Sequence, residues 1–255
     1  MDLAAIIGEF VKNSPLNRLG DRQIFDEPLI GVAAADDVLF DSLKQADVVC
    51  PQHLSPREWL PEAKAVIAFF LPFSECVRAA NRKPGVAARE WMIGRIEGEQ
   101  VNDALRRHLL STLQTDGCKA VVPPMDDRYA VVHRRSNWSE RHVAFIAGLG
   151  TFSLSRSLIT QKGSAGRLGS VIVDRELAAT PRAYRQREAY CTHCGACILR
   201  CPPLAITDTG KDNAVCGEYL DRVLARFHPR YGCGKCQTGV PCEAGNPTNG
   251  GAAAR

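Results

Sequence analysis

The sequence has no apolar run long enough to cross a membrane and no recognisable export signal. Its longest uninterrupted apolar stretch covers only 65–71, whereas a transmembrane helix needs ~20 such residues. The first ten residues include Asp2 and Glu9 and lack the cationic start of a secretory signal peptide. We therefore expect a cytoplasmic protein with no membrane partner.

Strong net charge and low-complexity segments are also lacking. The 255 residues are 45% hydrophobic and 24% charged, with a net charge of only +4, which excludes intrinsic disorder as the main state. No internal repeat occurs outside the cysteine pattern. The length fits one large domain or two smaller ones, with a hydrophobic core of ordinary size.

Cysteine, by contrast, is abundant. Of the eleven cysteines, eight lie between Cys191 and Cys242. In a cytoplasmic protein this clustering indicates metal or redox chemistry rather than disulfides. The other three, Cys50, Cys76 and Cys118, are scattered, and we expect them to be small buried hydrophobic residues.

Apolar periodicity predicts a layered α/β or α+β domain over residues 1–178. The expected helices cover 1–12, 101–113 and 139–147, and the expected strands 29–35, 65–72, 119–122, 129–132 and 170–173. Because 65–72 is apolar throughout, it predicts a strand buried on both faces. A polar connection (179–190) leads to a cysteine-rich domain (191–245) with one amphipathic helix over 219–227, and 246–255 is expected to be a frayed tail.

The first four clustered cysteines have a spacing typical of bacterial ferredoxins. Cys191, Cys194, Cys197 and Cys201, followed by Pro202, form the run C-x2-C-x2-C-x3-C-P. In two-cluster ferredoxins the first three bind one [4Fe–4S] cluster and the fourth binds the other. This spacing therefore requires a second set of cysteines.

The remaining cysteines supply that second set, because eight thiolates at four per cluster give two clusters. We predict a first cluster on Cys191, Cys194, Cys197 and Cys242, and a second on Cys201, Cys216, Cys233 and Cys236. The second set departs from a simple repeat, since five residues separate Cys236 from Cys242. The assignment of Cys242 to one cluster or the other stays open.

Zinc is the main alternative, because two sites of four thiolates could use the same eight cysteines. Zinc sites favour cysteines in pairs. In a run of three cysteines at x2 spacing one cysteine remains unpaired, so we favour iron–sulfur clusters. His193, inside the first motif, is expected to donate a hydrogen bond toward a cluster rather than to act as a ligand.

Three segments together resemble the epoxyqueuosine reductase family of iron–sulfur proteins. They are residues 139–174, the motif CTHCGACILRCPPLAI over 191–206, and YGCGKCQTGVPC over 231–242. The strand AKAVIAFFLPF fits the N-terminal domain of the same family. The element E-R-x-x-A-x-x-A-G-L-G over 140–150 makes this resemblance more specific than the cysteines alone.

The resemblance implies an α/β domain that holds cobalamin, fused to a ferredoxin-like module with two [4Fe–4S] clusters. It implies an enzyme, a reductase of an epoxide on a modified tRNA nucleoside, supplied by a donor such as ferredoxin or flavodoxin. Reductive dehalogenases share this layout, so the substrate class extends to small molecules. The Lys and Arg residues are spread along the chain and form no patch that would predict a tRNA footprint.

The sequence departs from the family at the catalytic acid. Family members carry an acidic residue six positions before the glutamate of the E-R pair, here Glu140, and that position is Arg134. An arginine cannot donate a proton near neutral pH, so Glu140 remains the candidate catalytic residue. Arg134 and Arg135 are expected to favour an anionic ligand, or no substrate at all.

Two further departures concern the cofactor and the length. No D-x-H-x-x-G stretch supplies a histidine for cobalt, and we assign no cofactor-binding residue beyond the cluster cysteines. The sequence also stops before the helical-repeat extension of full-length family members. We expect a short paralogue whose substrate differs.

Two other functions compete with the reductase: an electron-transfer protein without a substrate of its own, and a redox sensor. The reductase is favoured because residues 1–178 exceed what a ferredoxin module needs. Uptake of cobalamin by anaerobically purified protein would discriminate between them.

Overall fold

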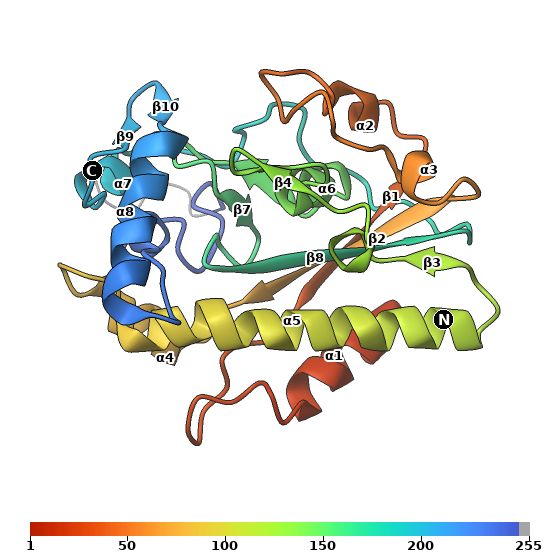
Figure 1. The fold of residues 1–255 in the computed structure, drawn as a ribbon, viewed down its shortest axis with the longest axis horizontal. Coiled ribbons are helices and arrows are strands. Elements are labelled where there is room, and N and C mark those ends of the chain that lie inside the picture. Colours follow the sequence, from red (N-terminus) through yellow and green to blue (C-terminus); the bar gives the residue numbers. More distant parts are fainter. Residues whose placement is uncertain (250–255) are drawn as a thin grey trace.

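The computed structural model describes residues 1–249, and its first part is organised around a four-stranded antiparallel sheet (Figure 1). The strand order is β1-β2-β8-β3, with bounds Leu29–Ala34, Ala65–Pro72, Gly166–Val173 and Ala120–Val121. The central strand β2 pairs with β1 from Ala65↔Ala34 to Phe70↔Leu29 and with β8 along its whole length. The chain is thus a mixed α/β protein whose sheets are antiparallel.

The strand predicted over 65–72 is confirmed, and all eight of its residues are buried. Successive side chains enter two different hydrophobic cores because they alternate between the faces of the sheet. Ile67, Phe69 and Leu71 belong to the first core. Val66 and Phe70 belong to the second core. Helices therefore cover both faces of the sheet.

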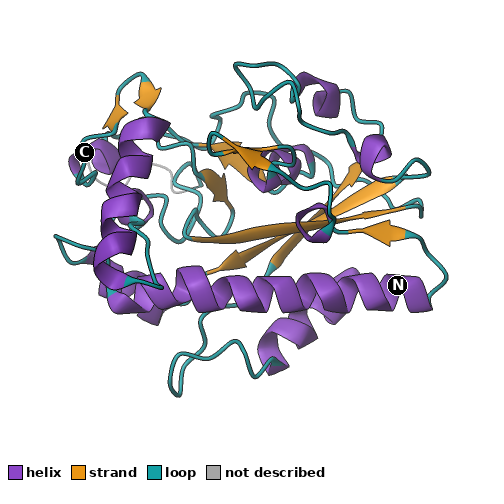
Figure 2. Cartoon of the chain, viewed as in Figure 1, coloured by secondary structure: helices purple, strands orange, loops and turns teal. Residues whose placement is uncertain are grey.

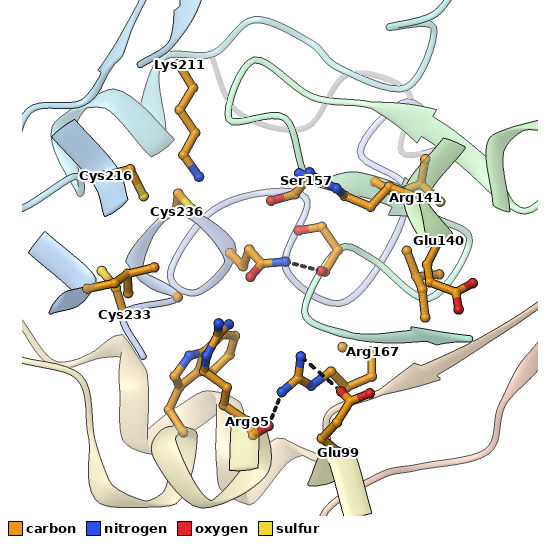
Figure 3. A pocket seen from close by; sticks show the side chains of 18 of the residues that line it. Arg95, Glu99, Glu140, Arg141, Ser157, Arg167, Lys211, Cys216, Cys233 and Cys236 are labelled. Carbon is orange, nitrogen blue, oxygen red and sulfur yellow. Dashed lines mark hydrogen bonds and ion pairs between the residues drawn. The ribbon is translucent and has the colours of Figure 1, made fainter. Parts of the chain in front are cut away.

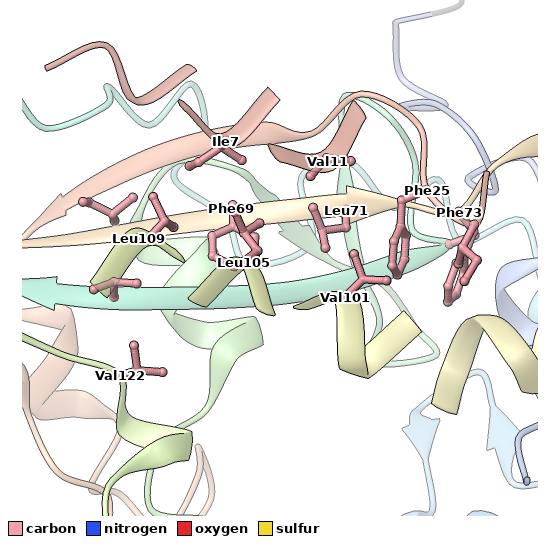
Figure 4. Packing of buried hydrophobic residues seen from close by; sticks show 14 of the residues in the cluster. Ile7, Val11, Phe25, Phe69, Leu71, Phe73, Val101, Leu105, Leu109 and Val122 are labelled. Atoms are coloured by element: carbon pink, nitrogen blue, oxygen red, sulfur yellow. The ribbon is translucent and has the colours of Figure 1, made fainter. Parts of the chain in front are cut away.

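The first core lies between the sheet and three helices: α1 (Leu3–Asn13), α4 (Glu75–Arg82) and α5 (Arg89–Thr115). α1 begins at Asp2, whose carboxylate accepts a hydrogen bond from Ala5 N at 3.0 Å. Val101, Leu105 and Leu109 of α5, spaced by four residues, are fully buried against the sheet (Figure 4).

The second core is covered by α2 (Leu39–Ser42), α3 (Pro56–Trp59) and α6 (Glu140–Ile146). Trp59 and Trp138 are buried there with their rings edge to face. The indole N–H of Trp138 donates to Ser170 Oγ at 2.9 Å, which satisfies a buried donor next to strand β8.

Small hairpins complete the first 173 residues: β4 (Val131–Val132) with β5 (Arg135–Ser136), and β6 (Gly150–Phe152) with β7 (Leu158–Thr160). A single 3-10 turn, η1, covers Pro123–Met125. The strand predicted over 129–132 is shortened to Val131–Val132. The chain reverses at His133 and Arg134, which have φ values of 47° and 62°.

The cysteine-rich part contains α7 (Ala196–Leu199), α8 (Asn213–Phe227), η2 (Lys235–Gln237) and the strands β9 (Ile206–Thr207) and β10 (Gly210–Lys211). The rest of it is loop, and α8 crosses the N-terminal end of α5 (Figure 2). The helix predicted over 219–227 begins six residues earlier, because the Asp212 carboxylate caps Ala214 N and Val215 N.

The predicted connection, 179–190, forms neither helix nor strand in the structure, but it is packed onto α6. Tyr184 is buried, and its hydroxyl donates to Phe145 O at 2.6 Å. Residues 246–249 form loop, and the remainder of the predicted tail lies outside the described residues. Over residues 1–249, no helix combines the length and apolarity that spanning a bilayer requires.

Candidate cluster sites and the cavity beside them

Four cysteines line a small cavity at the edge of the cysteine-rich part, which we call the first cavity. They are Cys191, Cys194, Cys197 and Cys242. Cys194 is exposed, and Ser164 Oγ lies 3.9 Å from Cys242 Sγ. The structure thus brings Cys242 together with the three cysteines of the first predicted cluster.

The other four cysteines line a larger cavity of about 450 Å³, the second cavity (Figure 3). They are Cys201, Cys216, Cys233 and Cys236. This is the set that spacing groups in the second cluster. Of the four, Cys201 is buried, and its sulfur accepts a hydrogen bond from Ala205 N at 3.2 Å.

Local backbone geometry separates the two sets. Gly195 has φ 74° and starts α7, whose single turn carries Cys201 away from Cys197. Gly234, at φ 63°, starts η2 between Cys233 and Cys236. A Cβ atom at Gly234 would lie 1.9 Å from the Trp91 ring, so only glycine fits this approach to α5.

The thiols are poorly suited to ionise on their own. Burial raises the pKa of Cys197 to about 11, of Cys233 to about 12 and of Cys242 to about 11, and neighbouring cysteines add to each shift. Burial also raises the pKa of Cys236, although Lys211 opposes it. Bound iron would supply the positive charge that four crowded thiolates need, so each donor set fits an iron–sulfur cluster.

The preference for iron over zinc rests on the spacing of the cysteines. Among residues 1–249, no three His, Cys, Asp or Glu side chains are arranged to hold one metal ion, and this favours neither metal. A zinc site requires its four ligands around a single ion, whereas a cubane distributes its thiolates over four iron atoms. His193 Nε2 lies 3.2 Å from Glu188 Oε2, which pairs this histidine with a carboxylate at the surface.

The second cavity is enclosed by both parts of the chain. Its apolar walls come from Phe70, Trp91, Leu158, Leu168, Ile206 and Leu220. Its charged side chains, apart from the cysteines, are Arg95, Glu99, Arg106, Glu140, Arg141, Arg167 and Lys211. The cavity therefore places the second cysteine set opposite charged side chains of α5, α6 and β8.

Glu140 is held in a buried network. Arg106, whose side chain is 4% exposed, donates to Glu140 at 3.1 Å and to Glu99 at 2.9 Å. Ser170 Oγ donates to the other oxygen of Glu140 at 2.6 Å. Burial raises the pKa of Glu140, while Arg106 opposes that shift. Glu140 thus has the environment of a carboxyl group that keeps a proton more readily than a surface glutamate.

Arg134 and Arg135, which were expected to favour an anionic ligand or no substrate, have partners within the chain. Arg134, at the β4–β5 turn, lies 2.5 Å from Asp221 of α8, and it is not among the cavity residues. Arg135 donates to the carbonyl oxygens of Ala46 and Val49. Both guanidinium groups already have partners from distant segments, which the local sequence does not reveal.

The scattered cysteines lie apart from both cavities. Cys50 and Cys118 are 7% exposed and belong to the second and first cores. Cys76 is half-buried beside Ser74. The cationic residues of the second cavity were not identified as site residues from sequence, because they come from α5, α6, β8 and β10, although Arg141 and Arg167 lie within the segment 139–174 that carries the resemblance.

The chain is similar to known proteins, although no protein-family profile matches it. It is 27% identical over 242 residues to an epoxyqueuosine reductase of Bacillus subtilis, covering 85% of this chain and 60% of that protein. Among solved structures, epoxyqueuosine reductase from Streptococcus thermophilus matches with a TM-score of 0.52 and 16% identity, covering 97% and 68% of the two chains. A catabolic reductive dehalogenase matches with a TM-score of 0.56 and 14% identity, covering 87% and 30%.

These comparisons confirm the resemblance to epoxyqueuosine reductases that the sequence motifs indicate. The chain spans about 60% of the length of its curated relative. The solved structures add that the fold is shared.

Proposed function

Starting from this resemblance, we propose that the chain is an iron–sulfur reductase with an N-terminal substrate domain and a ferredoxin-like module over 191–245. Two [4Fe–4S] clusters, one on each cysteine set, would supply low-potential electrons to a corrinoid or a substrate. One observation carries this proposal: the second cysteine set opens onto a cavity of about 450 Å³ that residues of the sheet domain also line. An electron carrier or a redox sensor needs no such cavity.

The two cysteine sets differ in access, which suits a reductase. Cys194 of the first set is exposed, so this side of the molecule is open to a protein donor of the ferredoxin or flavodoxin type. Cys201 of the second set is buried and lines the second cavity. Cys197 and Cys236, from different sets, are near enough to influence one another's charge.

The protein groups of the second cavity would orient the reactant and handle protons. Apolar side chains such as Phe70 and Leu168 exclude water from its walls. Glu140 is the carboxyl group best placed to exchange a proton with the reactant, because burial raises its pKa, although Arg106 and Ser170 oppose that shift. Arg134 takes no part in this, since it is paired with Asp221 outside the cavity.

If a corrinoid binds in the second cavity, polar groups such as Ser157 and Gln237 would hold its amide side chains. It would pass electrons from the clusters to the substrate. Cobalamin uptake by anaerobic protein, measured by equilibrium dialysis, decides between a corrinoid and direct reduction of the substrate.

The metal content tests the proposal directly. Anaerobically reconstituted protein should hold about eight iron and about eight sulfide per chain. Zinc near two atoms per chain, without charge-transfer absorption, would refute the iron–sulfur assignment.

Substrate turnover tests the proposed reductase activity. Because Arg134 replaces the family's acid, we expect little reduction of epoxyqueuosine in tRNA, as general acid catalysis supplies about 10²–10⁴-fold. Because residue 134 lies outside the second cavity, Arg134→Asp should leave that activity low, with Arg134→Gln as the control that removes the charge without adding an acid. A gain of activity in Arg134→Asp would show that the β4–β5 turn reaches the cavity. Efficient turnover by the unmodified protein would show that the proton comes from elsewhere, such as Glu140.

A further inference from the structure

Three cationic side chains of the second cavity have no acidic partner. Within residues 1–249, Arg95, Arg141 and Lys211 form no ion pair with an aspartate or glutamate. The cavity's own carboxylates are already engaged, because Glu99 pairs with Arg106 and Arg167, and Glu140 pairs with Arg106. The surplus of positive charge is therefore a property of the site.

Two of the three cations, Arg95 and Arg141, are held in place by neutral groups. The Arg95 guanidinium lies 4.4 Å from the centre of the Tyr231 ring, and its Nη2 donates to the Tyr231 hydroxyl at 3.1 Å. Arg141 Nη1 donates to the carbonyl oxygen of Arg156 at 2.8 Å. These contacts orient the guanidinium groups without neutralising them.

The three side chains enter the second cavity from different sides (Figure 3). Lys211 projects from β10 near Cys236, Arg95 projects from α5 on the opposite side, and Arg141 lies on a third side. The Nε atoms of Arg95 and Arg167 are buried and have no hydrogen-bond partner. Because a buried polar group without a partner is costly, these donors are available to a ligand.

The cavity combines this charge with apolar surface and a suitable size. Five cationic and two acidic side chains line it, together with Phe70, Trp91 and Leu220. Its volume of about 450 Å³ lies within the ~300–1,000 Å³ usual for small-molecule sites. A nucleic acid strand would not fit inside such a space, whereas a single ring with one anionic substituent would.

We propose that the second cavity binds a small organic anion, an apolar or aromatic body with a carboxylate or phosphate group, and that Arg95, Arg141 and Lys211 bind its oxyanion. This inference rests on the proposed function in one respect, namely that the cavity is the substrate site of the reductase. According to this proposal, the three cationic side chains bind the ligand's oxyanion and do not serve to offset the negative charge of the neighbouring thiolates.

Calorimetric titration of the anaerobically reconstituted protein tests this inference with matched anionic and neutral probes. Benzoate and guanosine 5′-monophosphate should each be compared with benzamide and guanosine, which lack the charge. Preference for benzoate identifies a carboxylate ligand, and preference for guanosine 5′-monophosphate a phosphate ligand. Equal affinity for an anion and its neutral analogue overturns the proposal, as does binding of a tRNA anticodon stem–loop without binding of either small anion.

Variants then test the named residues. Lys211→Met and Arg141→Gln should each weaken binding of the preferred anion about tenfold, because each removes a charge-assisted hydrogen bond. Arg141→Lys should restore part of that loss. Lys12→Met, on the exposed face of α1, is the matched control and should leave affinity unchanged.

The variants also separate this inference from competing explanations. If Lys211→Met shifts the reduction potential of a cluster but leaves anion affinity intact, the charge serves the thiolates and the proposal is overturned. If the protein binds anions in a Lys211-dependent way but incorporates no iron, the proposed reductase fails while the anion site stands. If iron is incorporated and no anion binds, the anion site fails while the iron–sulfur assignment stands.

Discussion

The sheet domain and the cysteine-rich part of this chain are held together by different means. The first has two large apolar cores, with residues such as Phe69, Leu105 and Trp138 almost completely buried. Among the described residues, the second contributes Cys201, Ala205 and Ile206 to an apolar cluster that it shares with Leu154 of the first part, and Cys201 is a predicted metal ligand. Hydrophobic burial therefore stabilises the first part, whereas the second depends on other interactions.

Polar contacts supply many of those interactions. Lys235 is 3% exposed, and its ammonium group donates to the carbonyl oxygens of Asn81 and Lys83 at 3.0 and 2.6 Å. The Asn81 amide donates to Cys233 O at 2.9 Å. Such bonds fix the geometry of a loop but contribute only about 1 kcal/mol each. The comparison thus predicts that the cysteine-rich part is stable only when its thiolates bind metal.

The largest expected effect follows from removing one cluster ligand. Cys194→Ala should leave the cysteine-rich part open to proteolysis while the sheet domain keeps its secondary structure, because metal binding provides most of the local folding energy. Cys118→Ala, a buried cysteine outside both sets, is the matched control and should leave both parts protected. Limited proteolysis with mass spectrometry gives the readout. Equal loss of both parts in Cys194→Ala would show that residues 1–178 and 191–245 are not separate units.

Shortening a side chain in the first core should instead destabilise the sheet domain. Leu105 is fully buried between α5 and the sheet, so Leu105→Ala should lower the free energy of unfolding by about 2–5 kcal/mol. Leu199 of α7 is 88% exposed, and Leu199→Ala should change it by less than about 0.5 kcal/mol. Urea denaturation followed by circular dichroism measures both. Similar losses in the free energy of unfolding for the two variants would contradict the conclusion that hydrophobic burial stabilises mainly the sheet domain.

Acid should destabilise the sheet domain through His53. Burial lowers the pKa of His53 to about 4, and Lys44 adds to the shift. Because the unfolded state binds the proton at about pH 6.5, the stability that neutral His53 contributes is present above that pH. It is lost as the pH falls from about 6.5 through about 4, and amounts to about 3 kcal/mol.

Tryptophan fluorescence can follow this transition, since His53 stacks on Trp138 with ring centres 5.8 Å apart. His53→Gln keeps a side-chain acceptor for Ser139 N and should flatten the dependence of the urea midpoint on pH. His142, whose pKa burial lowers to about 3, contributes over the same interval and should leave a residual slope. Parallel curves for wild type and variant would exclude His53 as a source of acid sensitivity.

The sequence predicted the parts of the fold that follow a regular apolar pattern. The buried strand over 65–72 is one example, because its eight apolar residues have only one plausible environment. The grouping of Cys201 with Cys216 is another, since ferredoxin spacing requires the fourth cysteine to leave the first set. The first feature follows from the local sequence, and the second follows from a known spacing of cluster ligands.

The start of α5 shows why the rest could not be predicted. The sequence predicted this helix only from residue 101, whereas it begins at Arg89. The missing part carries Arg95 and Glu99 at positions facing inward, toward the second cavity rather than the core. The same segment packs on the first core through Trp91 and Met92, but Gly94 and Gly98 occupy the next core-facing positions and interrupt the apolar stripe that periodicity detects. The start of the helix was missed for that reason.

The smallest expected effect concerns the exposed ion pair between Arg134 and Asp221, which joins the β4–β5 hairpin to α8. The two side chains are 53% and 61% exposed, so solvent screens their attraction, and a double-mutant cycle should give a coupling energy of about 0.2–1 kcal/mol. Arg134→Gln, Asp221→Asn and the double variant complete the cycle, measured by urea denaturation at low and high salt. Because Gly217 allows Arg134 to approach α8 closely, Gly217→Ala should weaken the same contact. A coupling energy well above 1 kcal/mol would mean that surface charge holds the two parts together, and the dependence of the cysteine-rich part on its thiolates would then be smaller than the comparison implies.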